Sequence, residues 1–239
     1  TMQGEAEKFE QSPFPLDEED VVCGGGTFAY LPGSEEAIRK VERILGEHHW
    51  EVCTYTGAEG TEESFLAMNA HSPRILQLYT HGFYYTPDRA SGIDYLKGFT
   101  DAMQLSGIVL SGGNAAWTGK ELPDGVRGGI LTAGTIAGMD LNGTELAVLS
   151  ACQTGLGKAT PEGLYGLQRA FKKAGVGTVV MSLWEISNNV SQEFMTTFYE
   201  RLMAQPNGWD KLKAFRETKA IIRSRHPEPY YWAAFVMLD

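Results

Sequence analysis

The sequence has 239 residues, of which 43% are hydrophobic and 21% charged, and its formal net charge is −10. This composition is typical of a globular protein with one large α/β domain or two small ones. The acidic balance argues against direct binding to nucleic acid. No apolar run approaches the roughly 20 residues of a membrane-spanning helix, so no membrane partner is expected.

The three cysteines, Cys23, Cys53 and Cys152, lie far apart in the chain. Their odd number and the lack of a CxxC pair argue against a disulfide framework and against a zinc site. We therefore expect reduced thiols, a cytoplasmic location, and no metal or other cofactor. Cys23 and Cys53 are most simply structural thiols.

The first 26 residues are polar and acidic, with an Asp-Glu-Glu-Asp run at 17–20 and three glycines at 24–26. Such a segment buries little apolar surface, which predicts a mobile arm or a linker. Thr1 precedes Met2, which indicates that residue 1 is not the natural start of the protein. The folded domain is expected over residues 27–239.

Strand and helix patterns alternate from residue 27 onward, which predicts a crossover series and a mainly parallel sheet. The expected strands cover residues 27–31, 50–55, 75–82, 107–114, 146–152, 177–184 and 230–238. The expected helices cover residues 34–45, 61–70, 131–138, 164–175, 190–202 and 212–222. The span from 83 to 144 is longer than a simple connection needs, so we interpret its loops as binding loops.

Two of the expected strands end in residues that carry chemistry, Cys152 and His81. In a parallel sheet the carboxyl ends of the strands lie at one edge, where ligands bind, so we expect the two side chains to converge. A histidine beside a thiol can take its proton and leave a nucleophilic thiolate. The backbone N–H groups of Gly82 and Cys152 are candidates for an oxyanion hole. The alternative interpretation is a buried, inert Cys152 and a solvent-facing His81.

Trp184 ends the strand that follows Cys152 and should reach the same edge of the sheet. It is either a wall of a substrate pocket or a core tryptophan. Glu185 beside it would attract a basic side chain of a substrate, but a solvated carboxylate is the simpler interpretation.

The glycines around residue 156 and Lys158 resemble a phosphate-binding loop between a strand and a helix. The P-loop pattern fails twice, because Ala159 stands where Ser or Thr would hold magnesium and Cys152 stands where the first glycine belongs. No G-x-S-x-G motif is present either, which argues against a serine hydrolase of that type. No nucleotide cofactor is expected.

Six stretches of the sequence occur together, in this order, in one known family. They include Tyr-Thr-His-Gly at 79–82 and Ser-Ala-Cys-Gln-Thr-Gly at 150–155, and their full ranges are 78–83, 131–141, 148–157, 166–171, 182–184 and 229–236. With them the sequence resembles the CHAT domain, a caspase-like cysteine peptidase domain often found after tetratricopeptide repeats in bacteria. The resemblance extends over about residues 27–239.

The resemblance implies a caspase-hemoglobinase fold, a three-layer sandwich in which helices flank a mainly parallel sheet of about six strands. It also implies a His–Cys dyad, which falls on His81 and Cys152, and an oxyanion hole at the amides of Gly82 and Cys152.

One part of the sequence departs from the family. Members usually carry acidic residues shortly after the Ser-Leu-Trp stretch, where this sequence has Ser187, Asn188 and Asn189, and Glu185 replaces the usual proline. The departure concerns substrate preference rather than the dyad. The substrate-binding candidates are accordingly Trp184, Glu185 and Asn188.

The expected function is a cysteine endopeptidase that cleaves a protein or peptide partner through a thioester acyl-enzyme. We expect an upstream tetratricopeptide-repeat domain or a regulatory protein to switch it on, because a partner can order the loops around a dyad. The alternative is an inactive or latent peptidase fold that serves as a protein-binding module.

Overall fold

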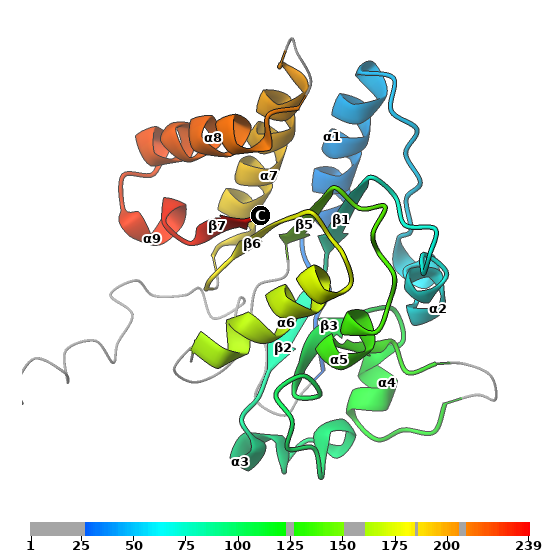
Figure 1. Ribbon diagram of the computed structural model, residues 1–239. Coiled ribbons are helices and arrows are strands. Elements are labelled where there is room, and N and C mark those ends of the chain that lie inside the picture. The colour runs from blue at the N-terminus through cyan, green and yellow to red at the C-terminus, as the bar shows by residue number, and fades with distance from the viewer. Residues whose placement is uncertain (1–26, 123–126, 151–160, 185, 206–208) are drawn as a thin grey trace, which may run out of the picture.

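The computed structural model of the protein describes residues 27–122, 127–150, 161–184, 186–205 and 209–239 (Figure 1). Within these ranges the chain forms an α/β fold with one mostly parallel sheet of four strands and a second, antiparallel sheet of three. None of the helices in the described ranges combines the length and apolar character that crossing a membrane requires. The predicted arm, residues 1–26, lies outside the described residues.

The larger sheet has the strand order β1, β5, β6, β7. β1 covers Ile75–Tyr79, β5 Leu146–Ser150, β6 Thr178–Ser182 and β7 Phe235–Leu238. The first three strands run parallel, and β7 is antiparallel to β6. The carboxyl ends of β1, β5 and β6 therefore lie at one edge of the sheet.

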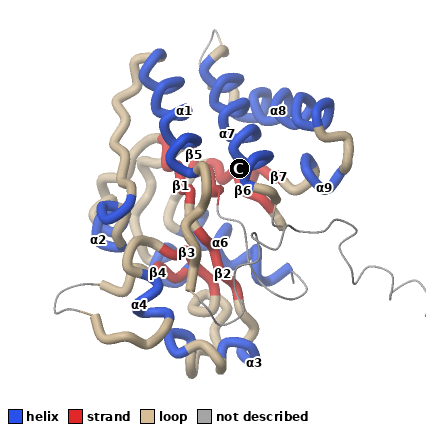
Figure 2. Tube along the Cα trace, turned by 180° about the vertical axis from the view of Figure 1, so that it is seen from behind, coloured by secondary structure: helices blue, strands red, loops and turns tan. Residues whose placement is uncertain are grey.

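Helices cover both faces of this sheet. Every residue of β5 and β6 is buried, which explains why both stretches are continuous apolar runs rather than alternating ones. Successive side chains of a strand point to opposite faces, so Val148 joins the core beneath α1, α7 and α8, while Leu149 joins the core beneath α5 and α6. Figure 2 shows α1 in front of β1 and β5, and Figure 1 shows α6 on the opposite side. These helices cover Ser34–Glu47 (α1), Ala133–Ala137 (α5), Pro161–Lys173 (α6), Asn188–Met203 (α7) and Lys211–Arg225 (α8).

The smaller sheet follows β1 after a single residue, Thr80. β2 (His81–Tyr84), β3 (Ser106–Val109) and β4 (Ile130–Thr132) pair antiparallel in that order. A third core, rich in aromatic rings, packs on this sheet around Trp117. Short helices surround these strands and the carboxyl end of the chain: Gly57–Glu59 and Asp94–Leu96 (both 3₁₀), α2 Glu62–Leu66, α3 Pro87–Ala90, α4 Gly113–Trp117 and α9 Pro229–Trp232.

The α/β class and the mostly parallel main sheet agree with the sequence-based expectation, but a sheet of about six strands is not confirmed. Residues 27–31 and 50–55, both expected as strands, belong to no sheet. Residues 50–55 are mostly exposed and so lack a face to bury. Residues 27–31 are held instead by a side chain, because the backbone of Phe28 bonds to Asn114.

Two further expected strands have different boundaries. The strand expected over 75–82 divides at Thr80 into β1 and β2, which belong to different sheets. The last expected strand, 230–238, is the short helix α9 followed by β7. The pattern at 107–114 does contain a strand, β3, but both of its partners, β2 and β4, run antiparallel to it, so it belongs to the smaller sheet and not to the parallel one.

Candidate active site

His81 lies at the carboxyl edge of the parallel sheet, but it is not the last residue of a parallel strand as predicted. β1 ends at Tyr79, which is opposite Ser150 of β5, and the N–H of Thr80 donates to the carbonyl of Ser150 at 3.4 Å. The Thr80 hydroxyl donates to the carbonyl of Val109, which draws the chain away to β3. His81 then opens β2, opposite Val109. The parallel register thus places His81 one residue beyond the last contact between β1 and β5.

The imidazole of His81 is held by a backbone carbonyl. Its Nε2 lies 2.7 Å from the carbonyl oxygen of Ala29. A carbonyl oxygen can only accept, so Nε2 carries the proton and Nδ1 is the basic nitrogen of the neutral ring. Burial lowers the pKa of His81 from its ordinary value of 6.5, and the bond to Ala29, which raises the pKa, offsets this only in part. At pH 7 the ring is therefore neutral.

The segment that supplies this carbonyl is anchored at Phe28. Its backbone N–H donates to Oδ1 of Asn114 at 2.6 Å, and Nδ2 of Asn114 donates to its carbonyl at 2.9 Å. The Phe28 ring packs against both His81 and Trp117, with centroid distances of 5.4 and 4.9 Å. The sequence did not reveal these roles of Ala29 and Asn114. An extended segment that bonds to a side chain has the same residue pattern as one that bonds to a neighbouring strand.

Gly82 is the second residue of β2, is buried, and lies opposite Ile108. The N–H of Tyr85 donates to the carbonyl of Leu105, the partner that the same register gives it. Hydrogen-bonded and non-hydrogen-bonded pairs alternate along an antiparallel ladder. Gly82 therefore forms a non-hydrogen-bonded pair, and its N–H points away from β3.

Trp184 and Asn188 lie beyond the carboxyl end of β6, on the opposite side of β5 from His81. Trp184 is half-buried, and its indole Nε1–H donates to the carbonyl of Tyr230 at 2.9 Å. Asn188 is the first residue of α7 and is also half-buried. Trp184 thus reaches the expected edge of the sheet, while its ring packs against the core beneath α7 and α8.

Two predicted site residues, Cys152 and Glu185, lie outside the described residues, as does the glycine-containing stretch 155–158. Cys152 follows Ser150, the last residue of β5, by two positions in the sequence. Among the residues that the structure describes, no group of three or more His, Cys, Asp and Glu side chains has an arrangement that would hold a metal ion.

Comparison with known proteins adds the family. Residues 9–239 match the CHAT domain. A stretch of 111 residues is 32% identical to tetratricopeptide repeat protein 28 of Mus musculus, and the corresponding comparison with the Homo sapiens protein of that name also gives 32% over 111 residues. This stretch is 46% of the present chain but only 4% of either relative.

The names of these relatives agree with the expected association between CHAT domains and tetratricopeptide-repeat proteins. Both relatives are mammalian, so the bacterial context of the resemblance stays a prediction, as does the domain boundary between residues 26 and 27. The family match takes in the whole of the described structure, including His81 and both sheets. The chain therefore belongs to the CHAT domain family, which is caspase-like.

Proposed function

We propose that the protein is a cysteine endopeptidase in which Cys152 is the nucleophile and His81 the general acid and base. The observation that carries this proposal is the position of His81, a neutral, carbonyl-anchored imidazole beside the end of β5. β5 ends at Ser150, and two peptide units separate Ser150 from Cys152, which limits the distance between their Cα atoms to about 7.6 Å. His81 lies beside that same end of β5, so the sequence attaches the proposed nucleophile two residues from the strand end that His81 adjoins.

The reaction would proceed in two stages. Nδ1 of His81 takes the thiol proton of Cys152, and the thiolate attacks the carbonyl carbon of the scissile peptide. The tetrahedral intermediate collapses to a thioester as the amine leaves with the proton from the imidazolium. Water then attacks the thioester with His81 as base, which releases the carboxylic acid and restores the thiol.

Backbone amides would stabilise the oxyanion of both tetrahedral intermediates. The Gly82 N–H, which points away from β3, and the Cys152 N–H are the two proposed donors. Each such donor typically contributes a factor of about 10² to 10³ in kcat.

The end of β6 would contribute to substrate selection. We propose that Trp184 forms a wall of the substrate site, because its anchored indole stands beyond the carboxyl end of a strand next to β5. Glu185 and Asn188 follow it in the sequence and are the proposed specificity residues. A peptide-library cleavage profile tests this assignment: Glu185 is expected to favour a basic side chain at the cleavage position, and a preference for acidic side chains would overturn it.

The direct test of the proposed activity is Cys152→Ala. This variant is expected to keep its fold and to lose cleavage of a quenched-fluorescence peptide library by at least about three orders of magnitude. Cys53→Ala is the matched control, because Cys53 is a free, exposed cysteine that takes no part in the mechanism. Cleavage that persists in Cys152→Ala would reject the nucleophile assignment.

A binding module without catalytic activity is the competing function, and thiol reactivity separates the two. In the folded protein we expect iodoacetamide to alkylate Cys152 well before Cys53, and His81→Ala to abolish that difference. Equal labelling of the two thiols, with and without a tetratricopeptide-repeat partner, would favour the binding module. The exposed Cys53 is a convenient internal reference because it lies far from His81 in the sequence and outside any strand or helix.

The similarity to tetratricopeptide-repeat proteins supports a regulatory partner of that kind. We propose that such a domain or protein controls access to the dyad, and that the substrate is a protein or peptide. A free, exposed Cys53 fits a reducing compartment, and we propose the cytoplasm. The test is to measure peptide cleavage with and without the repeat partner. Regulation of this kind predicts that the cleavage rate changes when the partner is added.

A further inference from the structure

Asn114 binds the backbone of Phe28 with both halves of its side-chain amide. Oδ1 accepts from the Phe28 N–H at 2.6 Å, and Nδ2 donates to the Phe28 carbonyl at 2.9 Å. The side chain thereby satisfies a backbone donor and acceptor that a neighbouring strand would otherwise satisfy. This arrangement holds residue 28 in place although the segment belongs to no sheet.

The next residue, Ala29, provides the carbonyl that accepts the Nε2–H of His81. That carbonyl belongs to the peptide unit directly after the one whose carbonyl Asn114 binds. The Phe28 ring, which contacts both His81 and Trp117, adds an aromatic contact from the same segment. Asn114 therefore acts on the histidine through two consecutive residues, Phe28 and Ala29, and no direct hydrogen bond joins it to His81 in the described part of the chain.

The helix that carries Asn114, α4, packs against β3, the strand that pairs with β2 and His81. A Cβ at Gly113 would meet Cγ1 of Val109 at 2.4 Å and the carbonyl of Gly129 at 3.1 Å, so α4 packs directly on the end of β3. Val109 is the residue that pairs with His81. The contacts thus form a closed loop from His81 to β3, to α4, to the Phe28–Ala29 backbone, and back to the imidazole.

We propose that Asn114 is a positioning residue for His81: it fixes the Ala29 carbonyl and thereby holds the imidazole with Nε2–H on that carbonyl, which leaves Nδ1 as the basic nitrogen. The proposal rests on the proposed peptidase function for its catalytic consequence, but its structural part can be measured separately. Asparagine suits this role because one short, neutral side chain supplies both a donor and an acceptor.

The first measurement is hydrogen exchange of the His81 Nε2–H, followed by NMR on the ¹⁵N-labelled 239-residue chain at neutral pH. The wild type is expected to show a protected imidazole N–H. In Asn114→Ala this N–H should exchange about tenfold faster, as expected when its own hydrogen bond to the Ala29 carbonyl is weakened by about the worth of one bond. Asn114→Asp keeps the acceptor for the Phe28 N–H and should retain part of the protection. Asn69→Ala is the matched control, because Asn69 also accepts a backbone N–H, that of Asp140 at 2.7 Å, elsewhere in the fold.

The second measurement is peptide cleavage by the same variants. Asn114→Ala is expected to lower kcat about 10- to 100-fold with little change in KM, because misplacing a catalytic group impairs the chemical step more than substrate binding. Asn114→Asp should recover part of that loss, and Asn69→Ala should match the wild type. A purely structural clamp would lower the melting temperature of Asn114→Ala but leave exchange and kcat unchanged in the folded protein.

The outcomes separate the two proposals. Unchanged exchange of the His81 Nε2–H in folded Asn114→Ala, or in Asn114→Asp if the alanine variant does not fold, overturns the positioning role. A wild type without a protected Nε2–H overturns it as well. Faster exchange in the variants, in a protein whose wild type neither cleaves peptides nor shows a reactive Cys152, supports the positioning role and rejects the peptidase.

Discussion

At the scale of single residues, the properties of His81 come from three neighbours with different tasks. Val109 fixes its backbone through the β2–β3 ladder, Ala29 fixes its ring through a carbonyl, and Phe28 covers a face of the ring. Burial disfavours the imidazolium and the carbonyl favours it, and the net direction is a lowered pKa. A base that is neutral at pH 7 suits the first step of the proposed reaction.

This pKa leads to a prediction on the pH dependence of Cys152 alkylation. Neutral His81 accepts the thiol proton and protonated His81 does not, so the rate should rise with pH and reach half its maximum below pH 6.5, the ordinary value of histidine. In His81→Ala the half-maximum should move to about pH 8.5, the range of an unassisted cysteine. The measurement is the iodoacetamide rate from pH 5 to 10, and identical profiles in the two proteins would show that His81 is not the base.

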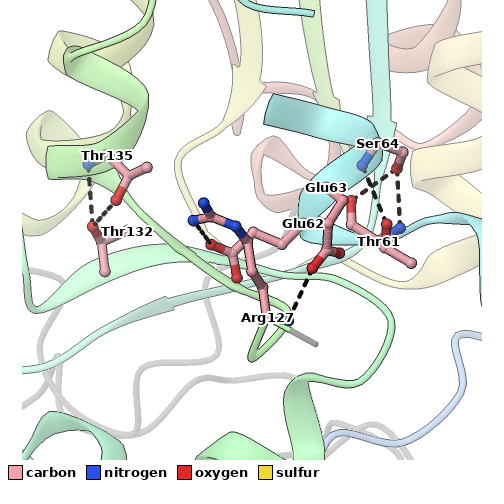
Figure 3. Close-up of polar contacts among 7 residues, drawn as sticks. All are labelled: Thr61, Glu62, Glu63, Ser64, Arg127, Thr132 and Thr135. Carbon is pink, nitrogen blue, oxygen red and sulfur yellow. Dashed lines mark hydrogen bonds and ion pairs between the residues drawn. The ribbon is translucent and has the colours of Figure 1, made fainter. Parts of the chain in front are cut away.

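At the scale of secondary-structure elements, α2 and the segment before β4 are joined by two adjacent carboxylates, shown in Figure 3. Glu63 accepts the backbone N–H of Arg127 at 2.9 Å, whereas Glu62 faces the Arg127 guanidinium at 3.6 Å. Burial raises the pKa of Glu62, an effect that Arg127 and the Gly129 N–H offset only in part. The backbone bond from Arg127 lowers the pKa of Glu63. The pKa values of these two neighbouring glutamates are thus shifted in opposite directions.

Glutamine substitutions at these two positions should therefore change stability with opposite signs. Ionised Glu62 is disfavoured in the folded state, so its contribution is lost as pH rises above the ordinary value of 4.5, and Glu62→Gln should stabilise the protein at pH 7. Ionised Glu63 is favoured, so its contribution is lost as pH falls, and Glu63→Gln should destabilise at pH 7. Urea unfolding at pH 4 and pH 7 checks both. The differences should shrink at the lower pH, and equal signs at pH 7 would contradict the assignment.

At the scale of the whole molecule, the main sheet is shared by two cores. Phe171 of α6 lies in the core on one face, and Phe198 of α7 in the core on the other, and both rings are fully buried. Successive residues of β5 contribute to each core in turn, so neither core is complete without the same strand. The main sheet, at whose carboxyl edge His81 lies, is therefore packed on both faces.

Because the two cores share β5, shortening a buried side chain on either face should destabilise the whole fold as one cooperative unit. Phe171→Ala and Phe198→Ala are each expected to lower the free energy of unfolding by about 3–5 kcal/mol, the usual cost of removing a buried aromatic ring. Leu212→Ala is the control, because Leu212 is 41% exposed and should change stability by no more than about 0.5 kcal/mol. Guanidinium unfolding followed by far-UV circular dichroism and by tryptophan fluorescence provides the measurement. Two separate transitions in either variant would contradict a single unit.

Prediction from sequence succeeded where the signal is local. A strand buried on both faces, such as β5 or β6, is a continuous apolar run. A helix buried on one face, such as α1, has apolar residues at 3.6-residue spacing. Prediction failed at residues 27–31, where a strand-like stretch lacks a partner strand, and at Thr80, where one residue moves the chain from one sheet to another. Neither event changes the hydrophobic period, so periodicity could not reveal it.

The sequence by itself determined that the chain has buried parallel strands, that His81 lies near the carboxyl end of one of them, and that its motifs match the CHAT domain family. Only the tertiary structure decided how His81 is held. Its carbonyl partner is 52 positions away, and the Asn114 contact that anchors that partner spans 86 positions. A backbone carbonyl exists at every residue and carries no side-chain signature, so only the folded chain selects which one reaches the imidazole.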